Sequence, residues 1–342
     1  MTMNKKIERY MNQMGENATK ALDSFSSVES DKKNKLISDI GLQLNANRQA
    51  ILQSNETDMR NAKKKNLAPS NIDRLFLDDQ RIDSMIHSIE EVVSLPDPIG
   101  ETIEQWTRPN GLIISKVSVP LGVIGIIYES RPNVTSDAAA LCLKSGNAVV
   151  LRGGSESIET NKRIYDSISL ALNENDIDQN TVQLVSDPDR EAVDMMLNGL
   201  NGNLDILVPR GGKSLVAKVQ SEARIPFIGH LEGICHVYIQ GSSEIDQAIQ
   251  IVVNSKMRRT GICGAAETIL IDRDSLDSHL ISIMNALKDS GCELRGDEEV
   301  LQMDADITKA TEEDWHTEYL DSIVSIKVVE DVKEAVSHIN RF

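Results

Sequence analysis

One cysteine of this chain lies in a setting suited to nucleophilic chemistry. Cys263 lies between two glycines, and the arginine pair Arg258-Arg259 precedes it. Only the thiolate form of cysteine is a strong nucleophile, and nearby cations or amide dipoles lower the pKa of a thiol. The glycines allow a substrate carbonyl and backbone amides to approach the sulfur closely. The alternative is a small buried thiol in a turn before the apolar run 268–271, since unpaired cysteines are often buried.

Two glycine-rich turns of the chain are suited to binding phosphate groups. Residues 152–155 read Arg-Gly-Gly-Ser and residues 209–214 read Pro-Arg-Gly-Gly-Lys-Ser, and each turn joins an expected strand to an expected helix. N–H groups at the start of a helix attract anions, and each turn adds an arginine. Neither turn is a dinucleotide fingerprint or a Walker A sequence, so a tight turn without a ligand is the alternative for each. Because both are expected on neighbouring strands of one sheet, together they favour a phosphate site at the carboxyl ends of the strands.

The composition restricts the classes of protein that this chain can belong to. Its 342 residues predict two domains, and an apolar fraction of 40% suffices for globular cores. A net charge of -17 argues against a general nucleic-acid or anionic-membrane binder. The four cysteines and six histidines show neither disulfide-framework nor metal-site spacing. There is no signal-peptide pattern, and the apolar run 123–128 is too short to span a bilayer, so we expect a cytoplasmic protein with reduced thiols.

Hydrophobic periodicity predicts a helical N-terminal part that is followed by a β-hairpin. Apolar residues recur at helical spacing up to about residue 95, and the lysine run 63–65 is interpreted as a solvated helix end. The dipeptide Asn110-Gly111 separates two β-rich runs, which predicts a hairpin over about residues 101–118.

Strand and helix patterns then alternate along the chain, which predicts parallel, doubly wound sheets. In the first series we expect strands at 123–128, 148–151, 182–185, 204–208 and 225–228, with helices at 134–145, 157–173, 190–197 and 213–222. In the second series we expect strands at 237–239, 268–271 and 323–328, with helices at 245–255, 278–290 and 332–339. The fold class is therefore α/β, with one domain over residues 1–232 and a second, carrying Cys263, over residues 233–342.

Several long segments, taken in order, resemble the aldehyde dehydrogenase superfamily and, within it, the γ-glutamyl phosphate reductase family. These segments are residues 119–125, 128–135, 144–154, 209–212, 230–233, the stretch around Cys263, and 315–319. The resemblance implies an aldehyde-dehydrogenase-like fold in which the N-terminal domain binds NADPH and the hairpin serves in oligomerisation.

The resemblance also implies a reaction. Cys263 would attack the γ-carbonyl of L-glutamyl 5-phosphate, phosphate would leave, and NADPH would reduce the resulting thioester to L-glutamate 5-semialdehyde, a step of proline biosynthesis. The backbone amide of Cys263 and the side chain of Asn133 would stabilise the oxyanion. For Asn133, a plain turn or helix-cap role after Pro132 is the alternative.

Binding residues are implied in the same way. Arg152 would lie beside the adenosine ribose, and the small side chain of Ser155 would leave room for a 2′-phosphate, which favours NADPH. The other residues implied are Arg210, Gly211, Gly212 and Glu318 for the cofactor, and Arg131, Arg258 and Arg259, unranked, for the substrate. For Glu318 a solvated surface charge is the alternative.

His230 occupies the position at which oxidising members of the superfamily carry a glutamate that activates water. The absence of that carboxylate favours reduction over the alternative, an aldehyde-oxidising dehydrogenase of the same fold, although Glu232 lies close by in the sequence. For His230 itself, a structural hydrogen bond is the alternative.

The family pattern that this chain resembles continues beyond Phe342. We therefore expect strand 323–328 and helix 332–339 to lack a neighbour on one side, and an inactive, truncated cofactor-binding remnant is a further alternative. The resemblance implies a homo-oligomer if the remaining part is present, and glutamate kinase as a partner.

Overall fold

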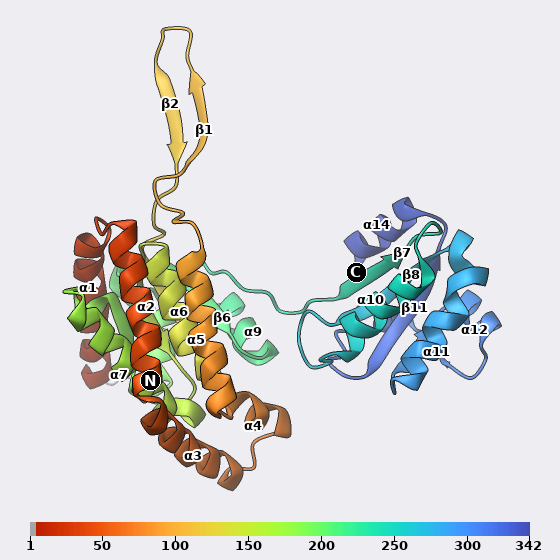
Figure 1. Ribbon diagram of the computed structural model, residues 1–342, viewed down its shortest axis with the longest axis horizontal. Coiled ribbons are helices and arrows are strands. Elements are labelled where there is room, and N and C mark those ends of the chain that lie inside the picture. Colours follow the sequence, from red (N-terminus) through yellow and green to blue (C-terminus); the bar gives the residue numbers. More distant parts are fainter. Residues whose placement is uncertain (1–4) are drawn as a thin grey trace. The chain divides into compact units, whose positions relative to one another are not determined.

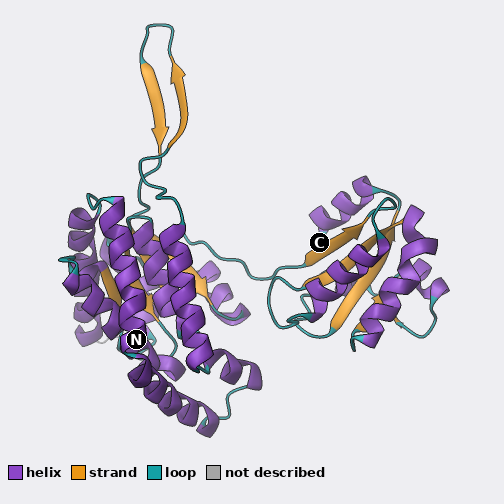
Figure 2. Ribbon diagram, in the orientation of Figure 1, coloured by secondary structure: helices purple, strands orange, loops and turns teal. Residues whose placement is uncertain are grey.

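The computed structural model describes residues 5–342, which form two compact units. The first ends at Gly229 and the second runs from His230 to Phe342, close to the boundary expected near residue 232. Each unit is an α/β structure with its own parallel sheet, and an antiparallel two-stranded ribbon is an additional part of the first (Figure 2). The chain therefore has the predicted fold class.

The elements of the first unit follow one another from red to green in Figure 1. Its helices are α1 (Lys5–Phe25), α2 (Ser30–Ala46), α3 (Arg48–Lys64), α4 (Pro69–Leu75), α5 (Asp79–Ser94), α6 (Asn133–Lys144), α7 (Ile158–Glu174), α8 (Glu191–Leu197) and α9 (Lys213–Glu222). Its strands are β1 (Thr102–Thr107), β2 (Ile113–Val117), β3 (Val123–Tyr128), β4 (Ala148–Arg152), β5 (Val182–Leu184) and β6 (Ile206–Arg210). A short 3₁₀ turn, η1 (Ser155–Ser157), precedes α7.

The sheet of the first unit has helices on both faces. Its strands are parallel, in the order β5-β4-β3-β6. β3 reads Val-Ile-Gly-Ile-Ile-Tyr and is buried along its whole length. Successive side chains of a strand point to opposite faces. Ile124 and Ile126 therefore join a core that contains residues of α2, α5, α6 and α7, while Val123 and Ile127 join one that contains residues of α1 and α8.

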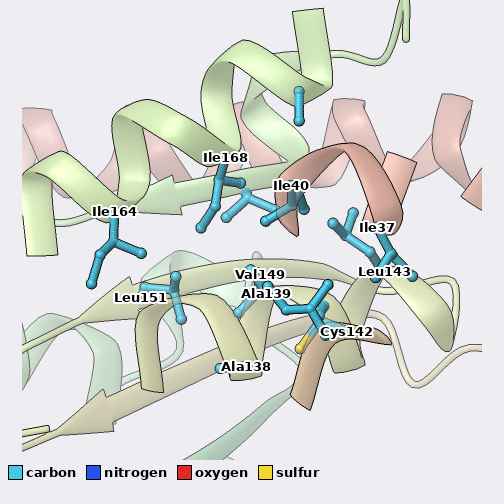
Figure 3. Packing of buried hydrophobic residues seen from close by; sticks show 14 of the residues in the cluster. Ile37, Ile40, Ala138, Ala139, Cys142, Leu143, Val149, Leu151, Ile164 and Ile168 are labelled. Atoms are coloured by element: carbon cyan, nitrogen blue, oxygen red, sulfur yellow. The ribbon is translucent and has the colours of Figure 1, made fainter. Parts of the chain in front are cut away.

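Aliphatic side chains fill the first of these cores, as Figure 3 shows. α7 contributes Ile164 and Ile168, α6 contributes Ala139, and β4 contributes Val149 and Leu151, all fully buried. Because aromatic residues make up only 3% of the chain, packing of branched aliphatic groups supplies most of the apolar burial.

The ribbon formed by β1 and β2 pairs only with itself. Its strands are antiparallel, with Trp106 opposite Ile114 and Thr107 opposite Ile113. Nearly all of its residues are exposed, including the large apolar side chains Ile103 and Ile113. A two-stranded ribbon buries little apolar surface by itself, so these side chains are available to pack against another surface.

The prediction of a strand at residues 225–228 is wrong. Residues 225–228 do not form a strand of the sheet, because only a single parallel bridge joins Phe227 to Leu207 of β6. The carbonyl of Pro226 accepts a hydrogen bond from the Leu207 amide at 2.9 Å, and the Ile228 amide donates to the Leu207 carbonyl at 2.8 Å. Proline has no N–H to donate to a ladder, which limits this segment to a short contact at the sheet edge.

The second unit is drawn from teal to blue in Figure 1. Its helices are α10 (Ile245–Met257), α11 (Ile281–Asp289), α12 (Glu298–Met303), α13 (Glu312–Trp315) and α14 (Val332–Arg341). Its strands are β7 (Cys235–Ile239), β8 (Ala266–Asp272), β9 (Glu293–Gly296), β10 (Thr308–Lys309) and β11 (Ile323–Val329), and they form a parallel sheet in the order β10-β9-β11-β8-β7.

β11 has a neighbour on each side, contrary to the expectation from the sequence. Ser325 pairs with Thr268 of β8 on one side and with Arg295 of β9 on the other. The expectation failed because β9, a short segment of sequence Glu-Leu-Arg-Gly, carries too few apolar residues to be recognised as a strand.

Helix α14 packs on this sheet through one face. Ala335 is buried in a small cluster with Leu270 and Val329, whereas Val336 and Ile339 are exposed. The expectation of an open side therefore holds for the outer face of this helix and not for the strand.

Candidate active site

The candidate nucleophile lies on an exposed loop of the second unit. Cys263 follows the end of α10 and precedes β8, and a hydrogen bond of 3.0 Å from the Ala265 amide to the Ile262 carbonyl closes the turn around it. Its side chain is exposed, so it is not the buried thiol of the alternative interpretation. Arg258 and Arg259, at the beginning of the same loop, are also exposed.

Gly233 brings the Cys263 loop close to Glu318. A Cβ atom at Gly233 would lie 3.1 Å from the backbone oxygen of Cys263 and 3.9 Å from Oε1 of Glu318. Cys235 approaches from the same strand region, and its Sγ donates to the Cys263 carbonyl at 3.3 Å. Residues distant in the sequence therefore meet here, and a side chain at Gly233 would crowd the space between the thiol loop and the carboxylate.

A buried ion pair anchors the segment that carries Glu318. Lys256 Nζ lies 2.6 Å from Glu267 Oε2, and both side chains are fully buried. Oε1 of Glu267 accepts the backbone N–H of Leu320 at 3.3 Å, and the Lys256 ammonium lies 5.9 Å from the centroid of the Tyr319 ring. Burial raises the pKa of the Glu267 carboxyl, while Lys256 acts in the opposite direction. The pair thus connects the end of α10, the start of β8 and the 318–320 segment.

A second set of polar contacts, around Asp314, holds Tyr319 in the same 318–320 segment. The hydroxyl of Tyr319 donates to Asp314 Oδ1 at 2.8 Å, and Arg295 donates to the same carboxylate at 2.6 Å. Burial raises the pKa of Asp314, but hydrogen bonds from Thr311, Arg295 and Tyr319 outweigh it and lower that pKa to about 2. The two residues that follow Glu318 are therefore held by contacts to the carboxylates of Asp314 and Glu267.

In the first unit, the two glycine-rich turns lie at the carboxyl ends of β4 and β6. The sequence suggested that these two strands are neighbours, and this prediction is wrong because β3 lies between them. The chain proceeds from β3 to β4 and β5 on one side and then returns to β6 on the other. Ligands of open α/β sheets bind at such a reversal of strand order, so the turns still flank the expected crevice.

The turn after β4 begins at a partly buried cation, Arg152. Arg152 donates to the Pro188 carbonyl at 3.3 Å, and burial lowers the pKa of its guanidinium, while Glu156 and Glu129 act in the opposite direction. Gly153 and Gly154 are needed for packing: a Cβ at Gly153 would clash with Asn161, and one at Gly154 would clash with Glu156. Ser155, which follows them, is exposed.

The turn after β6 already binds a carboxylate. The Gly212 amide, at the start of α9, donates to Oε2 of Glu129 at 2.8 Å, and a Cβ at Gly211 would lie only 2.5 Å from the same oxygen. Arg210 is exposed at this strand end. The start of α9 is thus a position that accepts negative charge, as its free N–H groups predict, and a phosphate there would replace the Glu129 carboxylate.

The remaining residues singled out from the sequence are distributed over both units. Asn133 begins α6, is partly buried and donates to Asp137 at 2.8 Å, which fits the helix-start alternative. Arg131 is partly buried, and His230 is exposed. Sequence reasoning did not identify Gly233, Cys235, Glu129 or the Lys256–Glu267 pair as parts of the site. Glu129 and Gly233 lie within segments 128–135 and 230–233, which carry the family resemblance and could have indicated them.

Between residues 5 and 342, no cluster of three or more His, Cys, Asp or Glu side chains has the arrangement of a metal site. Within the same range, no helix has the length and apolar character needed to cross a membrane.

Known proteins resemble this chain over nearly its whole length. No family model matches it. It is 50% identical over 336 residues to a γ-glutamyl phosphate reductase of Parvibaculum lavamentivorans, an alignment that covers 98% of this chain and 79% of that relative. The crystal structure of a γ-glutamyl phosphate reductase from Thermotoga maritima superimposes with a TM-score of 0.90 at 39% identity, covering 97% of this chain and 80% of that one.

More distant structures share the fold. An acetylating aldehyde dehydrogenase from Geobacillus thermoglucosidasius has a TM-score of 0.64 at 16% identity, covering 98% of this chain and 78% of its own. An engineered glycolyl-CoA reductase with bound NADP+ has a TM-score of 0.63 at 17% identity, covering 96% of this chain and 79% of its own. The fold of this chain is thus that of aldehyde dehydrogenases, and with half of its aligned residues identical to a named relative the chain belongs to the γ-glutamyl phosphate reductase family.

Proposed function

We propose that this chain reduces L-glutamyl 5-phosphate to L-glutamate 5-semialdehyde and phosphate, with NADPH as the reductant, as a step of proline biosynthesis in the cytoplasm. Membership of the γ-glutamyl phosphate reductase family supports the substrate and the reaction. The observation that carries the mechanism is the exposed thiol of Cys263, on a loop whose backbone lies close to Glu318 at Gly233.

Cys263 acts as the nucleophile. Its thiolate attacks the γ-carbonyl carbon, the bond from that carbon to the phosphate oxygen breaks, and a thioester remains on the sulfur. The backbone amide of Cys263 and the amide group of Asn133 stabilise the oxyanion, for which Asn133 would have to release Asp137. When bound, NADPH supplies a hydride to the thioester carbon. The bond from that carbon to Sγ then breaks, which releases the aldehyde and restores the thiolate.

The residues present fit a nicotinamide dinucleotide. The first unit offers the cation Arg152 beside Ser155, and the start of α9 accepts a carboxylate at Gly212, where a pyrophosphate would bind together with Arg210 and Gly211. In the second unit Glu318 would hold the nicotinamide ribose. Residues 1–232 would accordingly form the cofactor domain and residues 233–342 the catalytic domain.

The roles of the remaining residues belong to the same proposal. Arg131, Arg258 and Arg259 supply cations for the phosphate and α-carboxylate of the substrate. At His230 no carboxylate is present to activate water, which protects the thioester from hydrolysis. We further propose a homo-oligomer that uses the β1–β2 ribbon, and glutamate kinase as the source of the substrate.

Replacement of the thiol tests the mechanism. Cys263→Ala should abolish formation of the semialdehyde and of phosphate but leave binding of NADPH unchanged, as followed by nucleotide fluorescence. Cys142→Ala is the matched control, because this thiol is buried in the core of the first unit and should be dispensable for catalysis. Substantial turnover by Cys263→Ala would refute the thioester, and formation of an acid from an aldehyde by the unaltered protein would favour an oxidising dehydrogenase.

A further inference from the structure

A cavity of about 290 Å³ lies between the end of α3 and the start of α7 in the first unit. Lys64, the last residue of α3, and Lys65, which follows it, contribute to the cavity, and Ser155 contributes to it from the turn η1. Lys63 precedes them in the same helix but is absent from the lining. All three lysines are exposed, as expected of a solvated helix end, and Lys64 and Lys65 in addition line this cavity.

The acidic side chains that line this cavity are already engaged. Asp58 accepts both the backbone N–H of Thr160, at 2.8 Å, and the Thr160 hydroxyl, at 2.7 Å. Glu156 accepts the Ser130 N–H at 2.6 Å. The third carboxylate, that of Glu159, lies 3.1 Å from the ammonium of Lys162. None of these contacts is made with either of the two cavity lysines.

The side chains of the two cavity lysines, by contrast, form no hydrogen bond or ion pair with any of the described residues 5–342. A pair of ammonium groups at one cavity wall repel each other unless an anion lies between them. An anion with several oxygens and a double charge, such as a phosphate monoester, suits such a pair, because lysine binds phosphate as a point charge with rotatable donors. The hydroxyl of Ser155, which also lines the cavity, adds a neutral donor.

We infer that Lys64 and Lys65 bind the 2′-phosphate of NADPH together with Ser155, and that they set the preference for the phosphorylated cofactor. The inference rests on the proposed function, which places the adenosine ribose beside Arg152 and Ser155. It adds two residues of a helix that is distant in sequence from the sheet and its glycine-rich turns. Arg152, at the end of β4, does not line this cavity and donates to the Pro188 carbonyl, so the two lysines and Ser155 would supply the contacts to the phosphate.

Fragments of the cofactor test this inference without turnover. Titration calorimetry with 2′-AMP and with 5′-AMP compares an adenosine that carries the phosphate at the position in question with one that does not. Lys64→Ala and Lys65→Ala should each weaken binding of 2′-AMP about tenfold, and the double variant more, with binding of 5′-AMP changed by less than about twofold. In steady-state assays the ratio of kcat/KM for NADPH to that for NADH should fall by the same factor.

Lys63→Ala is the matched control, because it removes the same charge from the same helix end outside the cavity. Lys64→Arg and Lys65→Arg keep the charge and should retain most of the preference. All three lysines are exposed, so these changes leave the core intact, and unchanged thermal unfolding would verify it.

The outcomes separate the inference from the proposed function. If the unaltered protein prefers NADPH and 2′-AMP but the alanine variants keep that preference, or if Lys63→Ala lowers it equally, the two lysines do not bind the phosphate. If both cofactors lose affinity together, the lysines support α3 or the adenine and the inference is again wrong. If the unaltered protein binds 2′-AMP no better than 5′-AMP, the assignment of NADPH fails and this inference fails with it.

Discussion

Cys263 is exposed, whereas the other three cysteines of the chain are buried or partly buried. Burial raises the pKa of the Cys142 thiol to about 12 and that of Cys292 to about 11, and it also raises the pKa of Cys235. A thiol with a pKa near 11 is ionised in only about one molecule in a thousand at pH 8. Cys263 is exposed and is the thiol that a reagent can reach.

Alkylation should therefore be selective. At pH 8, iodoacetamide should modify Cys263 first, as followed by peptide mass spectrometry over time. Cys263→Ala should remove this first modification and leave the slow ones. Equal rates at Cys235 and Cys263 would contradict the prediction, and would mean that the strand region around Cys235 opens readily.

The sequence indicated the chemistry of single residues better than it indicated which residues lie next to them in space. Cys263 stands out by its own flanking glycines, and its exposure agrees with the predicted role of a nucleophile. Its closeness to Cys235 depends on how β7 aligns with β8, and the cavity position of Lys64 depends on how α3 packs against α7. Such contacts arise from tertiary packing, which local spacing does not encode.

At the scale of elements, the Lys256–Glu267 pair should dominate the stability of the second unit. Removing one partner of a buried pair leaves an uncompensated charge, so Lys256→Met should lower the free energy of unfolding by about 3–5 kcal/mol. The double variant Lys256→Met/Glu267→Met should recover most of this loss in urea titrations. It should still raise the KM for NADPH, because Leu320 loses the acceptor that holds the Glu318 segment.

The exposed pair Lys309–Glu298 provides the comparison. Its atoms lie 3.0 Å apart, but both side chains are well solvated, so Lys309→Met should change stability by less than about 1 kcal/mol. Equal losses for Lys256→Met and Lys309→Met would show that burial does not strengthen the inner pair.

His338 of α14 should make the second unit sensitive to acid. Burial, together with the charges of His236, Lys327 and Arg341, lowers the pKa of its imidazole to about 4. Because the unfolded chain titrates near 6.5, it binds more protons than the folded chain as pH falls from 6.5 towards 4. The stabilisation is thus complete above pH 6.5, and about 2 kcal/mol of it should be lost between pH 7 and pH 5.

A substitution distinguishes this effect from general acid sensitivity. His338→Leu should flatten the decline in urea-unfolding free energy between pH 7 and pH 5, followed by the fluorescence of Trp315, which packs edge-on against His338. His87→Gln, at an exposed position of α5, should leave the decline unchanged. A decline that is identical in His338→Leu and the unaltered protein would rule out this histidine as its cause.

Elements with continuous apolar patterns were predicted well from the sequence. The limits of β3 and α9 agree with the expected ranges, because Val-Ile-Gly-Ile-Ile-Tyr and a glycine-preceded amphipathic run are unambiguous. The strand expected at 225–228 reduces to one bridge because of Pro226, and β9 escaped notice because charged residues alternate with its single leucine. In both cases pairing with a neighbouring strand, and not local propensity, decides whether the segment forms a strand.

At the scale of the whole molecule, the β1–β2 ribbon should direct self-association. Ile103 is 59% and Ile113 is 62% exposed on a two-stranded ribbon that pairs with no other strand. Ile103→Asp/Ile113→Asp should shift the protein toward a monomer in sedimentation velocity, because charges at an apolar contact oppose burial. Leu42→Asp, at a similarly exposed position on α2, should leave the oligomer unchanged. A monomeric unaltered protein would contradict the prediction.

The position of β11 in the middle of its sheet affects how the second unit folds while the chain is being synthesised. β11 joins the pair β7-β8 to the pair β9-β10, yet it is translated after all four. The sheet of the first unit needs no residue beyond Arg210, so it can close early. Until residues 323–329 appear, the nascent second unit holds two separate strand pairs with open edges, and joining distant parallel strands is slow. Chaperones that recognise unpaired strands would find their binding sites in this interval, on the second unit alone.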